Sequence, residues 1–240
     1  MVAAFAKALA LSPMTLHRRI LVRSFFKDIR DMYDNCLVNG EPVGNWWLKH
    51  PQRRTFSGGI VFKPNGVVAP GEYNLWQGFA YEPKRGDWSL LRKHIHDIVC
   101  RREITDFNYY LNWMAHAVKH PERPAETAIV MRGEQGAGKG FPIRAFGRLF
   151  GQHYMHVITA EHVVGKHNAH LLDCIVLFAD EVLYASNPRH ADILKGMITE
   201  PVLTIEPKNV NAYQAPNRLH VMLSSNHDWV LSMGQEYLPG

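Results

Sequence analysis

The chain has 240 residues, of which 46% are hydrophobic and 20% are charged. This balance is usual for a globular protein with a sizeable core and not for a disordered chain. No apolar run approaches the roughly 20 residues that a transmembrane helix needs, which argues against a membrane-spanning protein. The three cysteines, Cys36, Cys100 and Cys174, form no C-x-x-C pair. Their spacing favours a reducing, intracellular setting over a disulfide framework or a zinc site.

The net charge of +5 is unevenly distributed along the chain. Residues 1–126 contain 18 Lys and Arg against 12 Asp and Glu, whereas residues 127–240 contain 9 against 10. A basic surplus in the first half indicates contact with a polyanion such as nucleic acid. An ordinary solvated basic surface remains the alternative.

The first half of the chain is predicted to be mainly helical, with an irregular stretch in its middle. Apolar residues recur at helical spacing over residues 3–38, with a break at Ser12-Pro13. Residues 41–88 are rich in Gly, Pro and aromatic residues and contain short strand-like runs such as Gly59–Phe62. Helical periodicity resumes in two later stretches, residues 88–102 and 105–119.

A polar, Pro-containing linker, KHPERPAE at residues 119–126, precedes a change of pattern. Apolar strands then alternate with helices, which predicts an α/β fold whose parallel sheet is covered by helices on both faces. The expected strands are 127–131, 154–158, 174–179, 202–206 and 219–224, and the expected helices are 139–150, 160–170 and 188–199. The expected domains are a helical segment (1–40), a mixed region (41–126) and an α/β core (127–240).

A glycine-rich phosphate-binding loop is predicted between the first strand of this core and the helix that follows. The stretch MRGEQGAGKGFPI matches the G-x-x-x-x-G-K pattern. Backbone N–H groups in such a loop bind phosphates, the helix N-terminus adds positive potential, and the lysine reaches the β and γ oxygens. The residues assigned to nucleotide binding are Gly133, Glu134, Gln135, Gly136, Ala137, Gly138, Lys139 and Gly140.

Two further strands end in polar residues that complement this loop. CIVLFADE predicts a buried strand with Asp180 as a Mg²⁺ ligand and Glu181 as the base that activates water. The strand Leu219–Leu223 leads to Asn226, whose amide is expected to contact the γ-phosphate or the attacking water. An exposed acidic pair and a simple turn are the alternatives at these two places.

The loop departs from its pattern at Gly140, where Ser or Thr normally supplies a hydroxyl ligand to Mg²⁺. No Ser or Thr occurs between Gly133 and Arg148. Mg²⁺ keeps several waters and needs only one or two protein carboxylates. We therefore expect Asp180, water and nucleotide oxygens to hold the metal.

Taken in order, these motifs resemble superfamily 3 helicases of the AAA+ class, and more closely the primase-helicases of phages and plasmids. The segments that carry the resemblance are NLWQGF, YLNWMAHAVKHPERPAETAIVMRGEQGAGKG, LLDCIVLFADE, ITEPVLTIEPKN and SSNHDW. The resemblance implies a P-loop AAA+ ATPase core that hydrolyses ATP with Mg²⁺ to move along single-stranded DNA. It also implies a hexameric ring, association with a primase or polymerase domain, and action in the cytoplasm of a bacterial host.

Two more features follow from the resemblance. A DNA-contacting hairpin would lie in EPKNVNAYQAPNR, with Lys208 near its tip as the DNA-binding residue. An arginine finger would follow the strand that ends at Asn226, but no arginine occurs after Arg218. The chain is therefore expected to be truncated or to lack the finger.

Three alternatives remain open from the sequence. A small-molecule kinase would use the same loop, and a nucleotide-gated DNA-binding module would need no turnover. Residues 3–23 form either a plain helix, which the pattern favours, or a helix-turn-helix.

Overall fold

The structure is a computed structural model that describes residues 26–180, 188–208 and 211–226. The chain divides into two compact units: Met1–Gly59 with Pro70–Glu72, and Ile60–Ala69 with Tyr73–Gly240. The boundaries predicted at residues 40 and 126 remain predictions. Within the described ranges no helix has both the length and the apolarity to cross a bilayer.

From residue 26 onwards, where the structure describes it, the first unit contains two short helices and a β-hairpin. Its elements are α2 (Phe26–Met32), β1 (Leu37–Val38), β2 (Glu41–Pro42) and α3 (Val43–Lys49). The helix predicted over residues 3–38 ends earlier, because Asn39 and Gly40 both adopt positive φ and turn the chain into the antiparallel β1–β2 pair. Residues 1–25, where the helix-turn-helix alternative falls, lie outside the described residues.

The helical part of the second unit agrees with the sequence analysis. A two-stranded sheet of β3 (Gly59–Val61) and β4 (Glu72–Asn74) precedes these helices in the chain. Helix α4 (Ser89–His94) then continues into the π-helical turn η1 (Ile95–Val99), and α5 spans Ile104–Lys119. The helices predicted at 88–102 and 105–119 are therefore confirmed.

A four-stranded parallel sheet forms the centre of the second unit, as the α/β pattern predicts. Its strands are β5 (Ile129–Arg132), β6 (Tyr154–Val157), β7 (Val176–Asp180) and β10 (His220–Ser225). They lie in the order β5-β10-β7-β6, and each adjacent pair is parallel. The order brings β5 and β7 to either side of β10, although both precede it in the chain.

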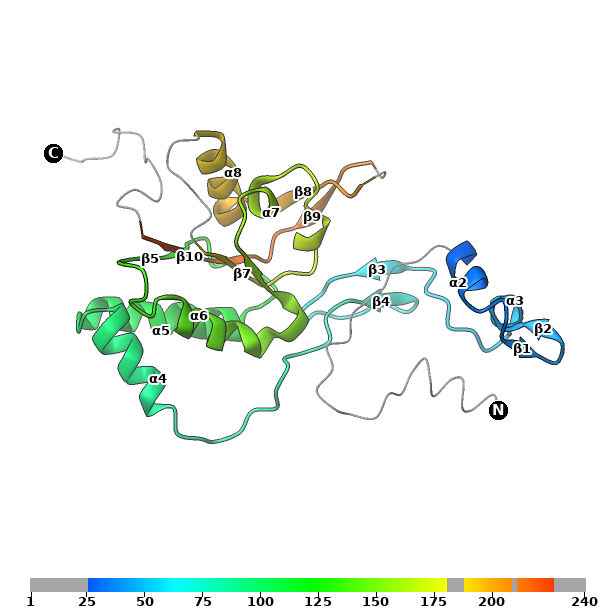
Figure 1. Cartoon of the computed structure of the whole chain (residues 1–240), viewed down its shortest axis with the longest axis horizontal. Coiled ribbons are helices and arrows are strands. Elements are labelled where there is room, and N and C mark those ends of the chain that lie inside the picture. Colours follow the sequence, from blue (N-terminus) through cyan, green and yellow to red (C-terminus); the bar gives the residue numbers. More distant parts are fainter. Residues whose placement is uncertain (1–25, 181–187, 209–210, 227–240) are drawn as a thin grey trace. The chain divides into compact units, whose positions relative to one another are not determined.

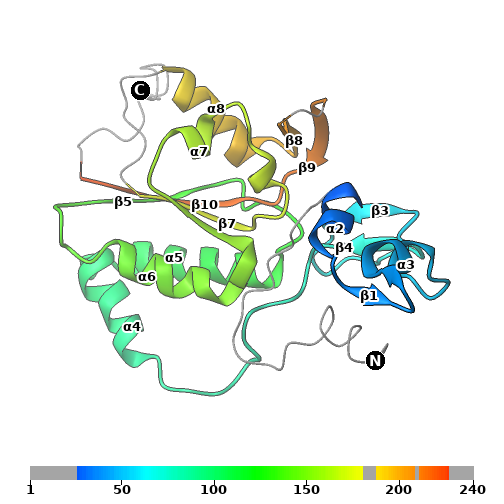
Figure 2. The same ribbon diagram turned by 45° about the vertical axis from the view of Figure 1, so that its right-hand side comes forward.

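Helices cover both faces of this sheet (Figures 1 and 2). Helices α5 and α6 (Gly140–Gly147) lie on one face, and α7 (Glu161–Val164) and α8 (Pro188–Thr199) lie on the other. Alternate residues of β7 divide between two buried clusters: Val176 and Phe178 pack with α5 and α6, whereas Leu177 and Ala179 pack with α7 and α8. Because β7 is buried on both faces, its sequence is continuously apolar.

The remaining elements connect these layers. The 3-10 helices η2 (Arg148–His153) and η3 (Ala169–Leu171) precede β6 and β7 respectively. Strands β8 (Val202–Ile205) and β9 (Tyr213–Pro216) form an antiparallel hairpin before β10. Buried Asn217 joins this hairpin to α8 by donating to the carbonyls of Met197 and Glu200, at 2.8 and 2.7 Å.

A buried histidine begins the central strand β10. His220 is 0% exposed, and its Nδ1 lies 3.1 Å from the carbonyl oxygen of Arg218. Its ring contacts the edge of Trp113 and lies beside His116. Burial, with a smaller effect of the neighbouring His116, lowers the pKa of His220 to about 4. The neutral imidazole is therefore part of the folded core.

We expect this histidine to make the fold acid-sensitive. The folded-state pKa lies below the usual value of about 6.5, so the unfolded chain takes up the proton first and stability falls as the pH drops from about 6.5 towards 4. The free energy of unfolding lost over this range amounts to about 3 kcal/mol. Urea unfolding measured across this pH range should show a smaller fall in the free energy of unfolding for His220→Phe than for the parent. The exposed control His167→Gln should show the same dependence of the free energy of unfolding on pH as the parent. Equal pH dependence for His220→Phe and the parent would contradict the role assigned to His220.

Candidate functional site

The predicted phosphate loop connects β5 to α6 at the carboxyl edge of the sheet. The loop begins after Arg132, and α6 begins at Gly140. Gly136 and Gly138 have φ of +81° and +80°, a conformation that residues with a Cβ rarely adopt. The N–H of Gly133 donates to the carbonyl of Ser225 at 3.2 Å. This bond fixes the start of the loop to the end of β10.

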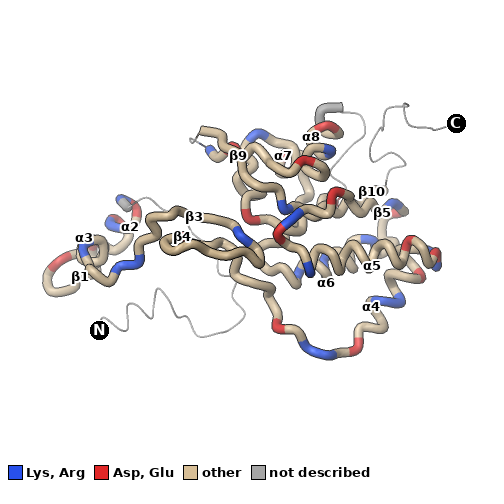
Figure 3. The backbone as a smooth tube through the Cα atoms, turned by 180° about the vertical axis from the view of Figure 1, so that it is seen from behind, with Lys and Arg blue, Asp and Glu red and all other residues tan. Residues whose placement is uncertain are grey.

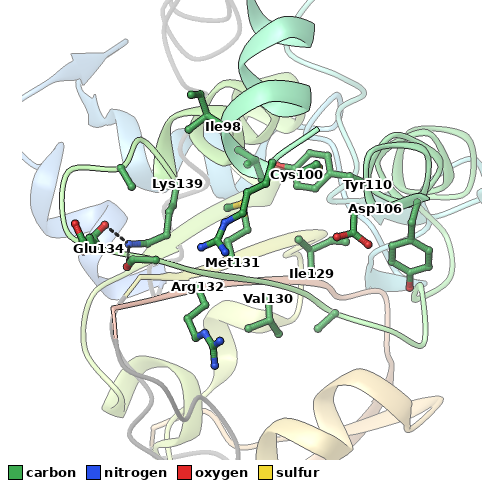
Figure 4. Close-up of a pocket in the computed structure, with 16 residues that line it drawn as sticks. Ile98, Cys100, Asp106, Tyr110, Ile129, Val130, Met131, Arg132, Glu134 and Lys139 are labelled. Atoms are coloured by element: carbon green, nitrogen blue, oxygen red, sulfur yellow. Dashed lines mark hydrogen bonds between the residues drawn. The ribbon is translucent and has the colours of Figure 1, made fainter. Parts of the chain in front are cut away.

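Lys139 folds back over the loop (Figure 4). Its Nζ donates to the carbonyl oxygens of Gly133 at 2.5 Å and Glu134 at 2.8 Å. The ammonium thus lies against the start of the loop, at the junction with α6, where the helix N-terminus adds positive potential. Both the ammonium and the helix N-terminus favour the binding of an anion at this position.

Helix α4 supports the other end of the loop. His94 Nε2 lies 3.2 Å from the carbonyl oxygen of Gly138. The His94 ring also contacts Phe141 of α6 edge-on, with the centroids 5.6 Å apart. A Cβ on Gly138 would come within 2.9 Å of the His94 ring. His94 was not among the predicted site residues, because no local pattern links it to a loop 44 residues further along the chain.

Asp180 ends β7 and contacts three other elements. Ser224 of β10, its register partner, donates a hydrogen bond from Oγ to Asp180 Oδ1. His156 Nε2 of β6 lies 3.3 Å from Oδ2, and Arg144 Nη1 of α6 lies 3.9 Å from the same oxygen. The His156 ring stacks on Phe178, which holds its orientation. The carboxylate predicted as a metal ligand is therefore paired with side chains of the protein.

The side chains around Asp180 are poorly suited to holding a resident magnesium ion. Mg²⁺ prefers six oxygen ligands in octahedral geometry. Around Asp180 the described residues supply one carboxylate, which a guanidinium and an imidazole share. In the described part of the chain, no group of three or more His, Cys, Asp or Glu is arranged to hold a metal ion. The assignment of Mg²⁺ to Asp180 remains a prediction.

The other predicted site residues differ in where they lie. Asn226 follows β10 directly and is exposed at the same carboxyl edge as the loop and Asp180. Lys208 is exposed in the connection between β8 and β9, as the predicted hairpin requires, and not at the carboxyl edge of the parallel sheet. Glu181 lies outside the described residues. The roles of all three remain predictions.

A cavity of about 710 Å³ opens beside the loop (Figure 4). Lys139 and Glu134 line its loop side, and the edge strand β5 lines its floor. The opposite wall comes from η1 and α5 and includes Cys100, Asp106 and Tyr110. Burial raises the pKa of Tyr110, whose hydroxyl is buried without a hydrogen-bond partner. The sequence predicted a helix over residues 105–119 and gave no signal that it lines a cavity.

A family of unknown function, DUF5906, matches residues 131–237. A DNA primase-polymerase of Nitratiruptor phage NrS-1 is 28% identical over 121 residues, which cover 49% of this chain and 17% of that protein. This similarity supports the phage replication part of the resemblance. No helicase or AAA+ family is among these matches.

Solved structures of the NrS-1 C-terminal region share the fold. The apo structure of residues 305–718 has a TM-score of 0.63 and 18% identity, covering 74% of this chain and 45% of that one. An A-form apo structure of the region has a TM-score of 0.58 and 19% identity, covering 70% and 42%. The chain thus spans less than half of each related structure and about a sixth of the primase-polymerase.

The function expected from the motifs is corrected by these findings. A DNA helicase that moves along single-stranded DNA was predicted, but the relative found by sequence is a primase-polymerase, and the related structures come from the NrS-1 C-terminal region. A glycine-rich loop followed by an acidic strand end serves many enzymes that bind phosphates. The helicase assignment was therefore wrong.

The contact between His94 and Gly138 gives a testable prediction. Gly136→Ala and Gly138→Ala both place a Cβ at positive φ, at a cost of about 1–2 kcal/mol. Space is open around Gly136, whereas His94 blocks the Cβ of Gly138, so Gly138→Ala should lower the free energy of unfolding more. In urea titrations, adding His94→Ala to Gly138→Ala should remove the extra destabilisation that Gly138→Ala shows over Gly136→Ala. The effects of His94→Ala and Gly136→Ala on the free energy of unfolding should simply add. Equal costs for both alanines would contradict the contact.

Proposed function

We propose that this chain is a nucleoside-triphosphate-binding module of a phage-type DNA primase-polymerase. The observation that carries the proposal is the position of Lys139, whose ammonium lies on the carbonyls of Gly133 and Glu134 inside a glycine-rich loop. The sequence similarity to the NrS-1 primase-polymerase supports the replication context. Action in the cytoplasm of an infected bacterium is part of the same proposal.

Phosphate binding follows from the geometry of the loop. The positive φ of Gly136 and Gly138 gives the loop the compact conformation in which successive N–H groups can point at one anion. The Lys139 ammonium would exchange its two carbonyl acceptors for phosphate oxygens, with which it forms stronger, charge-assisted hydrogen bonds. The P-loop and AAA+ character of this core belongs to the proposal and is supported by the strand order around β10.

The cavity beside the loop has suitable size and chemistry for the nucleoside. Its volume of about 710 Å³ lies in the usual range for small-molecule sites. The Asp106 carboxylate can hydrogen-bond to a sugar or base, while Ile129 and Met131 offer apolar surface. Because Lys139 lines the same cavity, a nucleotide there would direct its phosphates towards the loop.

We assign DNA synthesis to a separate primase or polymerase domain. Nucleotidyl transfer uses two metal ions held by clustered carboxylates. Across the residues that the structure describes, no such cluster is present. We propose this module as the partner of a primase or polymerase domain, with Lys208 on the β8–β9 hairpin as a contact to single-stranded DNA.

Charge is mixed over the part of the chain that precedes the sheet (Figure 3). Lys and Arg alternate with Asp and Glu along the tube around α4. This mixture favours a solvated surface there over a continuous polyanion-binding face. A ring assembly, Glu181 as the base and Asn226 as a contact to the γ-phosphate or the attacking water remain predictions.

Lys139→Ala should weaken triphosphate binding strongly. Loss of two charge-assisted hydrogen bonds predicts an affinity lower by on the order of 100-fold. Titration of a fluorescent ATP analogue measures it, with circular dichroism to confirm folding. Lys119→Ala, at the exposed end of α5, is the matched control and should bind like the parent. Parental affinity in Lys139→Ala would refute the proposed function.

A further inference from the structure

The glycine that breaks the loop pattern creates space for an arginine. Gly140 opens α6, and Arg144 follows one helical turn later. A Cβ on Gly140 would overlap Nη1 of Arg144 and lie 3.2 Å from its Cζ. The guanidinium therefore occupies the volume into which a Ser or Thr side chain would project. Side chains at i and i+4 share one face of a helix, so the missing Cβ and the arginine form a single local feature.

The same guanidinium reaches the carboxylate on β7. Arg144 Nη1 lies 3.9 Å from Asp180 Oδ2, and the Arg144 side chain is 48% exposed. One positive group thus lies between the beginning of α6 and the end of β7. In phosphate-loop proteins Mg²⁺ rides on the nucleotide between the loop hydroxyl and a strand-end carboxylate. Arg144 occupies that place, while the surrounding residues fit a resident magnesium ion poorly.

We propose that Arg144 replaces the divalent metal as the second phosphate-binding cation of this site. The inference rests on the proposed triphosphate binding. A guanidinium presents a planar fork of donors that matches two phosphate oxygens. Because its side chain is half exposed, Arg144 can turn from Asp180 to a bound triphosphate without opening the core. Triphosphate binding then depends only weakly on Mg²⁺, and Gly140 leaves the space in which the guanidinium lies beside Asp180.

The first test compares ATP binding in EDTA and in Mg²⁺ by isothermal titration. The parent should bind with Kd values within about threefold of each other. Arg144→Gln should lose about tenfold or more in EDTA and recover in Mg²⁺, because the guanidinium is removed and Asp180 is free for the metal. Arg148→Gln, an exposed arginine one turn further on, is the matched control and should behave like the parent.

The results that would contradict the role of Arg144 differ from those that would contradict the proposed function. A parent that binds ATP only with Mg²⁺, or an Arg144→Gln variant unchanged in EDTA, overturns the role of Arg144 and leaves the proposed function standing. A parent that binds ATP under neither condition overturns the proposed function and this inference with it. Arg144 is partly exposed, so its replacement leaves the buried core intact.

The second test uses Gly140 to move the arginine without mutating it. Gly140→Ala displaces the guanidinium and adds no ligand, so metal-free ATP binding should weaken about as much as in Arg144→Gln. Gly140→Thr displaces it and adds a hydroxyl, so metal-free binding should weaken while Mg²⁺-dependent binding strengthens. The metal alone can be followed by Mn²⁺ electron paramagnetic resonance, which should detect tighter binding to Gly140→Thr than to Gly140→Ala. Metal-free binding unchanged in both variants would overturn the proposal.

Discussion

The central position of β10 is the constraint on which the candidate site depends. All six residues of this strand are buried, and it pairs in parallel with β5 on one side and β7 on the other. Its register places Ser225 opposite Arg132 and Ser224 opposite Asp180. The phosphate loop and the acidic strand end therefore reach the same edge of the sheet, although about 45 residues of chain separate them. A shift of β10 would break both the Gly133–Ser225 bond and the Ser224–Asp180 bond.

Packing of α6 fixes the second part of the site. Ile143 and Phe146 are buried between α6 and the sheet, with 0% and 2% of their surface exposed. These two anchors set the rotation of a helix of only eight residues. The side of α6 that carries Gly140 and Arg144 is consequently turned towards the end of β7. The apolar core thus determines which charged group stands beside Asp180.

The charged groups at this edge of the sheet are already paired with other groups of the protein. Lys139 is satisfied by backbone carbonyls, and Asp180 is paired with Arg144, His156 and Ser224. A triphosphate would compete for the two cations and leave Asp180 with its serine and histidine partners. Such an arrangement suits binding of an anion more directly than capture of a metal ion. It agrees with a module that holds nucleotide beside a separate synthetic centre.

Patterns in the sequence were enough to predict the α/β class, the parallel sheet, the helices α4 to α6 and the loop at residues 133–139. These features rest on local signals: apolar periodicity, glycine spacing and strand ends. It misplaced the end of the first helix, because the Asn39-Gly40 turn overrode helical periodicity. It also led to the wrong function, because short motifs are shared among enzyme classes.

Only the tertiary structure decided what surrounds the loop. The contacts of His94 with Gly138 and of Arg144 with Asp180, and the cavity formed by η1, α5 and β5, join residues that lie far apart in the sequence. Such pairs depend on the strand order and on how each helix is rotated over the sheet, and neither is encoded in a local pattern. Gly140 was therefore visible in the sequence only as a missing hydroxyl. In the structure, the guanidinium of Arg144 fills the space that a side chain at position 140 would occupy.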